Sequence, residues 1–149
     1  MATQLAMYLL DTNVISELRR GKPRQSVEVR AWAASVPASQ LFLSAISILE
    51  IEKGILVLER RPPDQSGLKG SALRVWLAGV RATFAGRILP FTENTVMLCA
   101  TLHVPNPRPD RDAIIAATAL EHRMAVVTRN TADFEGAGLA LINPFEQQR

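Results

Sequence analysis

Residues 8–18, YLLDTNVISEL, place three apolar residues directly before an acid, and that acid directly before a helix-forming run. The apolar run Met7–Leu10 is short and uniformly hydrophobic, which predicts a buried parallel strand. Residues 11–13 then supply the turn and the N-cap of the following helix. Because ligands of open α/β sheets bind beyond the carboxyl ends of the strands, Asp11 lies where a functional site is expected. Asp11 or Thr12 equally suits a plain helix cap, so this junction alone leaves both interpretations open.

The same order of strand and helix repeats along the chain. Further strands are predicted at Leu41–Leu43, Ile88–Phe91, Ala125–Thr128 and Leu139–Ile142. Further helices are predicted at Ser26–Val36, Ser44–Arg60, Ser71–Phe84, Thr92–His103 and Asp112–His122. The segment Arg61–Gly70, rich in proline, glycine and charge, is predicted to be a loop. Because strands alternate with helices, the expected class is α/β, a three-layer α/β/α sandwich around a central, mainly parallel sheet of four to five strands.

The composition limits the kind of protein. A length of 149 residues with 48% hydrophobic content suits one domain with its own core. The net charge of +3 is compatible with a nucleic-acid partner without requiring one. The single Cys99 forms no intrachain disulfide and fits a buried thiol in a reducing compartment. No apolar run reaches the roughly 18 residues of a membrane span, and no basic segment precedes the first apolar residues, so we expect a cytoplasmic protein without a membrane partner.

Acidic residues recur where the predicted strands end. Asp11 follows the first strand, Glu50 lies in the helix after the second, Asp112, with Asp110 close by, begins a small-residue helix, and Asp133 follows the fourth strand. Carboxylates that converge at one sheet edge repel one another unless a cation lies between them. Ligation by oxygen alone favours Mg²⁺ or Mn²⁺. Each acid also has a plainer interpretation, as a helix cap, a turn cap or a solvated helix charge, so the prediction rests on the whole set.

Several segments resemble, in order, the motifs of PIN-domain ribonucleases of the VapC/FitB toxin type. They are DTNVISEL at 11–18, SAISILEIEKG at 44–54, DAIIAATA at 112–119, and TRNTADF at 128–134 followed by NPF at 143–145. The second motif of this family has its acid four residues before a glycine, which selects Glu50 over Glu52. The resemblance implies a single PIN domain over residues 1–149, with an N-terminal extension at 1–6 and a C-terminal tail at 143–149.

The resemblance also implies an activity, the Mg²⁺-dependent cleavage of RNA, with Mn²⁺ as an alternative ion. Asp11, Glu50 and Asp112 would bind the metal and form the catalytic triad, and a metal-activated water would hydrolyse the phosphodiester bond. Supporting roles are implied for Thr12, Asn13, Asn130 and Asp133, and substrate binding for Arg129.

The fourth motif departs from the family pattern. Asn130 stands where some members carry an acid, and an amide oxygen still ligates a metal or orients a water. Whether Asp133 supplies the missing charge stays open, and one fewer carboxylate weakens the case for a second metal ion. Arg129 suits either a contact to RNA phosphate or a solvated surface position.

The resemblance further implies partners and leaves alternatives. Relatives of this type are neutralised by a small antitoxin that covers the acidic cleft and binds operator DNA, and they form homodimers and toxin–antitoxin hetero-oligomers. The apolar faces of Ser44–Leu58 and Ser71–Val80 exceed what one sheet covers, which leaves surface for such contacts. The main alternative is a non-catalytic PIN-fold module that binds RNA or protein. A phosphoryl-transfer or receiver-type domain is disfavoured. A haloacid-dehalogenase-like phosphatase needs a second acid where this chain has Asn13, and a receiver domain needs a lysine late in the chain, whereas the last lysine here is Lys69.

Overall fold

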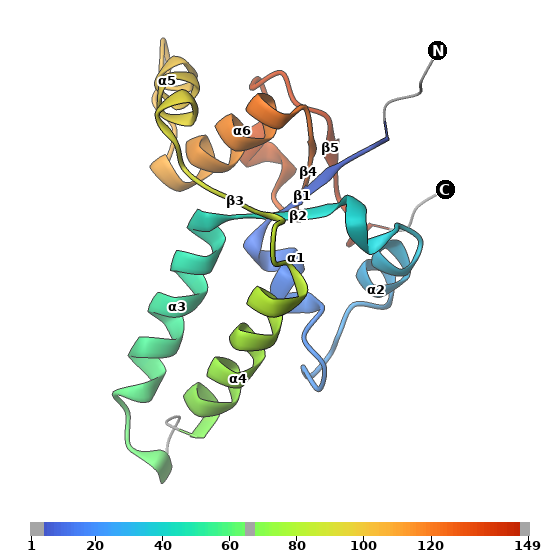
Figure 1. Cartoon of the computed structure of the whole chain (residues 1–149), viewed down its shortest axis with the longest axis vertical. Helices are drawn as coiled ribbons and strands as arrows, with labels where there is room; N and C mark the ends of the chain where they lie inside the picture. The colour runs from blue at the N-terminus through green and yellow to red at the C-terminus, as the bar shows by residue number, and fades with distance from the viewer. Residues whose placement is uncertain (1–4, 65–67, 147–149) are drawn as a thin grey trace.

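The structure is a computed structural model that describes residues 5–64 and 68–146 (Figure 1). Its middle layer is a five-stranded, all-parallel sheet in the order β3-β2-β1-β4-β5. The strands are β1 (Tyr8–Leu10), β2 (Leu41–Ser44), β3 (Ile88–Leu89), β4 (Ala125–Val127) and β5 (Leu141–Ile142). The first strand of the chain is therefore the central strand of the sheet, with β2 on one side and β4 on the other. Parts of the predicted terminal segments (1–4 and 147–149) and of the predicted loop (65–67) lie outside the described residues.

Helices cover both faces of the sheet. They are α1 (Thr12–Glu17), α2 (Val27–Ala34), α3 (Ala45–Glu59), α4 (Leu68–Thr83), α5 (Glu93–Leu102) and α6 (Asp110–His122), with short 3₁₀ helices η1 (Ala38–Gln40) and η3 (Thr131–Phe134). Helices α1 to α4 lie on one side and α5 and α6 on the other (Figure 1), so the predicted three-layer α/β/α sandwich is confirmed. Among the described residues, no helix combines the length and the apolar character needed to cross a membrane.

The two faces of the sheet bury two separate cores. Successive side chains of a strand point to opposite faces. Leu10 and Val127 therefore contribute to the core beneath α1 to α4, whereas Leu9 and Val126 contribute to the core beneath α6. The second core also encloses Phe134 of η3, which is almost completely buried. These cores fix the sheet between the helices and so fix the positions of the loops at its carboxyl edge.

Two helices begin two or three residues earlier than predicted, and α2 ends two residues earlier, at Ala34 rather than Val36. Helix α4 begins at Leu68 rather than Ser71, and α6 begins at Asp110 rather than Asp112. In α4 the added turn includes Gly70, where a Cβ atom would come within 3.0 Å of the Glu59 side chain. Glycine therefore permits a close approach to α3, which propensity alone does not indicate. In α6 the added residues are Asp110 and Arg111, and an acid in the first turn interacts favourably with the helix dipole.

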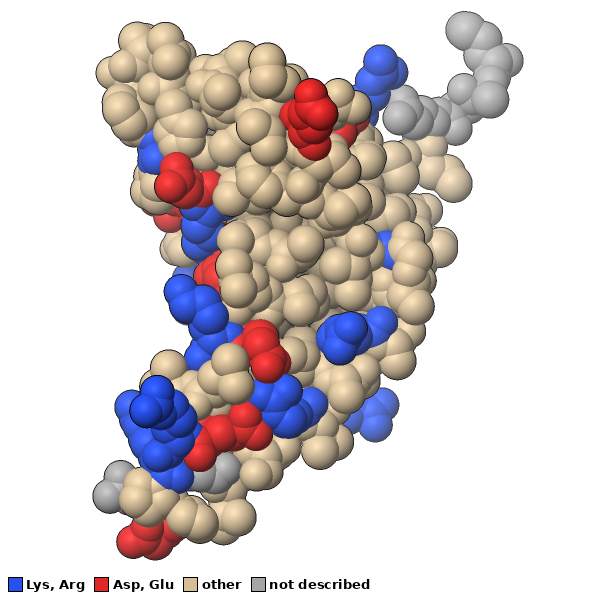
Figure 2. Space-filling model, turned by 60° about the vertical axis from the view of Figure 1, so that its left-hand side comes forward, with Lys and Arg blue, Asp and Glu red and all other residues tan. Residues whose placement is uncertain are grey.

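Helices α3 and α4 pack along one another and project away from the sheet (Figure 1). Arg74 of α4 bridges them, since its guanidinium binds both Glu52 and Glu59 of α3. In the lower part of Figure 2, basic and acidic side chains are interspersed, so this surface carries no uniform positive field. Leu56 and Val57 of α3 remain exposed, which confirms that apolar helix surface is left uncovered.

Candidate active site

Asp11 is the most deeply buried acid at the carboxyl edge of the sheet. It follows β1 directly and caps α1, since its Oδ1 accepts the backbone N–H of Thr12 at 2.7 Å. Its Oδ2 accepts the hydroxyl of Thr128 at 2.7 Å, and its own backbone N–H donates to the carbonyl of Val127 at 2.9 Å. The side chain is 0% exposed. Asp11 is therefore a helix cap and, at the same time, a carboxylate held in one orientation by donors from two elements.

Two further acids reach the same point from different helices. Glu50 projects from α3, where its Oε1 accepts the hydroxyl of Thr12 at 3.1 Å, and the same hydroxyl lies 3.0 Å from Ser47 Oγ. Asp112 lies in the first turn of α6. Burial raises the pKa of Asp112 above its ordinary value, against the opposing effect of Arg111.

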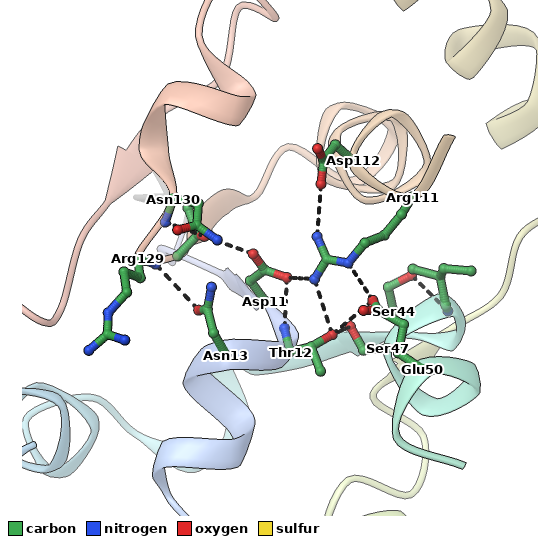
Figure 3. Close-up of polar contacts among 12 residues, drawn as sticks. Asp11, Thr12, Asn13, Ser44, Ser47, Glu50, Arg111, Asp112, Arg129 and Asn130 are labelled. Atoms are coloured by element: carbon green, nitrogen blue, oxygen red, sulfur yellow. Dashed lines mark hydrogen bonds and ion pairs between the residues drawn. The ribbon is translucent and has the colours of Figure 1, made fainter. Parts of the chain in front are cut away.

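The centre of this group is a basic residue that the sequence did not single out. Arg111 extends from α6 between the acids (Figure 3), with its Nε 2.6 Å from Glu50 Oε1 and its Nη1 2.8 Å from Asp112 Oδ1. Its Nη2 contacts Asp11 Oδ1. Burial opposes the guanidinium charge, but the bonds to Glu50 and Asp11 outweigh it and raise the pKa of Arg111. The available signal was its place in the first helical turn beside Asp112.

The acids that competed for these roles lie elsewhere. Glu52, two residues from Glu50, is occupied by Arg74 of α4. The side chain of Asp110, two residues from Asp112, is 92% exposed, and its Oδ1 lies 3.4 Å from Nε2 of His103. The structure therefore brings Glu50 and Asp112 to Asp11 and leaves their neighbours outside the group.

The remaining predicted residues lie beside the three acids rather than among them. Asn13 accepts the backbone N–H of Arg129 through its side-chain oxygen at 3.3 Å, and the backbone N–H of Asn130 donates to the Thr128 hydroxyl at 3.0 Å. The guanidinium of Arg129 points away from Asp11 (Figure 3) and lies 3.9 Å from the centre of the Phe145 ring. Asp133 is exposed, and its charge adds to the upward shift in the pKa of Asp112. These side chains thus lie outside the central group, which consists of Asp11, Glu50, Asp112 and Arg111.

The central group fits a hard cation in its chemistry. Asp11, Glu50 and Asp112 present oxygen atoms alone, and all three face one positively charged guanidinium. With Arg111 between them, the described residues include no group of three acidic, histidine or cysteine side chains arranged to hold a metal ion. The donor set therefore suits Mg²⁺ or Mn²⁺, while its present arrangement holds an arginine.

Thr128 is a supporting residue that the sequence did not single out, and we predict that its hydroxyl stabilises the site. Thr128→Val keeps the shape but removes the donor to the buried Asp11 carboxylate, so we expect the free energy of unfolding to fall by about 1–3 kcal/mol. Urea unfolding followed by circular dichroism measures this free energy of unfolding. Thr118→Val is the matched control, because the equally buried Thr118 hydroxyl donates only to a carbonyl of its own helix. Equal losses in the two variants would contradict the prediction.

Comparison with known families defines the class of protein first. A family model described as PIN domain matches residues 8–138 of this chain. That range contains every strand except β5 and all of the central group. The fold and the site therefore define a PIN-domain protein.

Individual relatives then narrow the class. The chain is 37% identical over 148 residues to the VapC ribonuclease Y4jK of Sinorhizobium fredii, covering 94% of this chain and 99% of that protein. It is 37% identical over 145 residues to toxin FitB of Neisseria gonorrhoeae, covering 93% and 99%. Among solved structures, FitAB bound to an IR36 DNA fragment superposes with a TM-score of 0.83 at 34% identity, over 96% of this chain and 99% of that one. The chain belongs to the VapC/FitB family of PIN-domain toxins.

Proposed function

We propose that this protein is a metal-dependent endoribonuclease, the toxin of a toxin–antitoxin pair, and that it hydrolyses RNA phosphodiester bonds. The observation that carries the proposal is the convergence of Asp11, Glu50 and Asp112, from three separate elements, at the carboxyl edge of the sheet. A relative of 37% identity over almost the whole chain is named a ribonuclease, which supports the same reaction.

We assign metal binding to the three acids and their positioning to neighbouring hydrogen-bond donors. Asp11, Glu50 and Asp112 would hold Mg²⁺ or Mn²⁺, which supplies stabilisation of phosphoryl charge and a lowered pKa for a bound water. Thr128 and the backbone N–H of Thr12 hold the Asp11 carboxylate in place through hydrogen bonds to its two oxygens. The Thr12 hydroxyl orients Glu50. Charge-assisted bonds of this kind preorganise the acids before the substrate arrives.

Cleavage assays on the purified protein test this proposal. Defined RNAs, including tRNA and rRNA fragments, are incubated with Mg²⁺, with Mn²⁺ and with EDTA. We expect cutting at a few sites that is lost in EDTA. Retained RNA binding without cleavage under every metal condition would instead identify a non-catalytic binding module.

A groove beside the acids is the path that we propose for the RNA strand. It has a volume of about 370 Å³, begins at Thr12 and Glu50, and is lined further out by Trp76. Its basic residues are Arg19, Lys22 and Lys69. Lys22 is paired with the buried Glu17, so Arg19 and Lys69 are the residues that we assign to phosphate. A groove lined by an aromatic ring and by basic side chains suits a strand whose bases stack and whose phosphates need neutralising.

We predict that Lys69→Glu weakens RNA binding. It replaces one phosphate contact by a repulsive charge, so we expect the dissociation constant for a single-stranded RNA to rise about tenfold at low salt. Fluorescence anisotropy in EDTA measures binding without cleavage. Arg30→Glu makes the same charge change on α2, away from the groove, and should alter the affinity much less. Equal weakening by the two variants would show that only net charge matters.

We also propose that a small antitoxin binds this chain and operator DNA. The similarity to FitAB bound to an IR36 DNA fragment supports this proposal. A second groove, of about 510 Å³ between α1 and α4, offers it an apolar surface that includes Ile15, Val75 and Val80. Size-exclusion chromatography of the chain co-expressed with the protein encoded beside it tests this hetero-oligomer. Sedimentation of the chain alone tests the proposed homodimer, for which Leu56 and Val57 of α3 provide exposed apolar area.

A further inference from the structure

The three acids of the central group do not bind three different partners; they share one. Each nitrogen of the Arg111 guanidinium faces its own carboxylate, Nε that of Glu50, Nη1 that of Asp112 and Nη2 that of Asp11 (Figure 3). Nη2 also lies 3.3 Å from the Thr12 hydroxyl. All three nitrogens of the planar guanidinium are thus paired with carboxylate oxygens, which a single surface ion pair does not achieve.

The oxygens that face Arg111 belong to the three acids to which we assign the divalent ion. Oδ1 of Asp11, Oε1 of Glu50 and Oδ1 of Asp112 all face the guanidinium. One positive charge offsets part of the mutual repulsion of three carboxylates, one of them completely buried. An ion and the guanidinium therefore compete for the same space and for the same negative charge.

The position of Arg111 allows its side chain to move away from the three acids. Its side chain is 31% exposed, so one side of it already faces solvent. It is attached in the first turn of α6, after Pro109 and the exposed Asp110. A flexible stem at a helix end allows other rotamers that require no movement of the sheet.

We infer that Arg111 is an internal cation that occupies the carboxylate cluster in the metal-free protein and must withdraw when a divalent ion binds. The inference rests on the proposed function only in taking the ion to bind these acids. Its consequences are that Arg111 stabilises the metal-free fold and weakens the affinity for metal. An arginine that merely anchored α6 would affect stability but would not compete with the ion.

Titration calorimetry with Mn²⁺ and no RNA tests the competition. In Arg111→Gln the cation is removed and a polar side chain is kept, so we expect Mn²⁺ to bind about tenfold more tightly than in the unchanged protein. Arg108→Gln is the matched control, because the Arg108 guanidinium binds the backbone carbonyls of Asp133 and Glu135 rather than the acids. We expect its affinity for Mn²⁺ to stay unchanged. Arg111→Lys, which keeps the charge without the fork, should give an intermediate affinity.

Thermal unfolding and nuclear magnetic resonance complete the test. Arg111→Gln should melt at a lower temperature than the unchanged protein in EDTA. This difference in melting temperature should disappear in saturating Mn²⁺. In the unchanged protein, the Nε–H signal of Arg111, bonded to Glu50, should lose its protection from solvent exchange as Mg²⁺ is added. This measurement needs no variant to fold.

Two results would overturn the inference, and they differ in what they say of the proposed function. If Arg111→Gln binds Mn²⁺ with equal or lower affinity than the unchanged protein, Arg111 does not compete, while the metal-dependent nuclease stands. If neither protein binds Mn²⁺ at all, the inference and the metal dependence fail together. Cleavage activity enters neither comparison.

Discussion

Asp112→Asn is expected to lower the rate of RNA cleavage by about a thousandfold or more, with the fold retained. The change removes one of three carboxylates that face the Arg111 guanidinium but keeps the size and the hydrogen-bonding oxygen of the side chain. Under the proposed function, this carboxylate would help to hold the metal ion, so its loss removes stabilisation of the charge that develops in the reaction. Single-turnover cleavage of one defined RNA, with circular dichroism on the same sample, measures both quantities.

Asp110→Asn provides the control for this loss. It makes the same chemical change two residues away on the same helix, at a side chain that is almost fully exposed and lies near His103. We expect cleavage within about threefold of the unchanged protein, as for an exposed pair of little energetic weight. If the two variants lose activity equally, or if Asp112→Asn stays active, the assignment of Asp112 to the metal is wrong.

Phe134→Ala is expected to lower the free energy of unfolding by about 3–5 kcal/mol. Phe134 is 1% exposed and packs in the core that includes Leu9, Ile115 and Val126. Truncation removes most of its apolar area and leaves a cavity between η3, α6 and the sheet, which rigid neighbours fill only in part. The total free energy of unfolding of most single domains is about 5–15 kcal/mol, so this variant should be close to the limit of a stable fold.

Chemical denaturation of Phe134→Ala and Phe91→Ala separates this cause from a general cost of losing an aromatic ring. Phe91 is 46% exposed, so its removal opens no internal cavity, and we expect a change of about 1 kcal/mol or less. Similar losses for the two variants would show that the packing around Phe134 is not what stabilises this face. Phe134 closes the fourth motif, so its loss also tests whether that motif is structural.

The strand-to-helix junctions were the most predictable part of the molecule. The apolar run before Asp11 and the alternation of strand and helix were enough to predict a parallel sheet with acids at one edge, because such connections obey strong geometric rules. The order of the strands was not predictable in the same way. It depends on which faces pack together across long stretches of sequence, as the pairing of β1 with β4 shows.

Within the site, motif spacing selected Glu50 over Glu52, and the structure gives the physical difference, since Glu52 is bound by Arg74. Arg111 is not predicted from the sequence because a basic residue in the first turn of a helix opposes the helix dipole, and its place beside Asp112 does not by itself indicate a role. Its other two carboxylate partners lie about 60 and 100 positions away in the sequence. The guanidinium of Arg129, which the resemblance assigns to substrate binding, lies over Phe145, a contact that spacing along the chain does not reveal.

The central place of β1 has a consequence for the synthesis of the protein. Residues 8–10 leave the ribosome long before residues 125–127, yet one side of their strand pairs with those residues, and Asp11 receives a hydrogen bond from Thr128. Pairing over such a distance cannot begin until almost the whole chain has emerged. A nascent chain that ends before β4 lacks half of the neighbours of β1 and one of the donors to Asp11. We therefore expect translation itself to keep this nuclease harmless until its last strands are made.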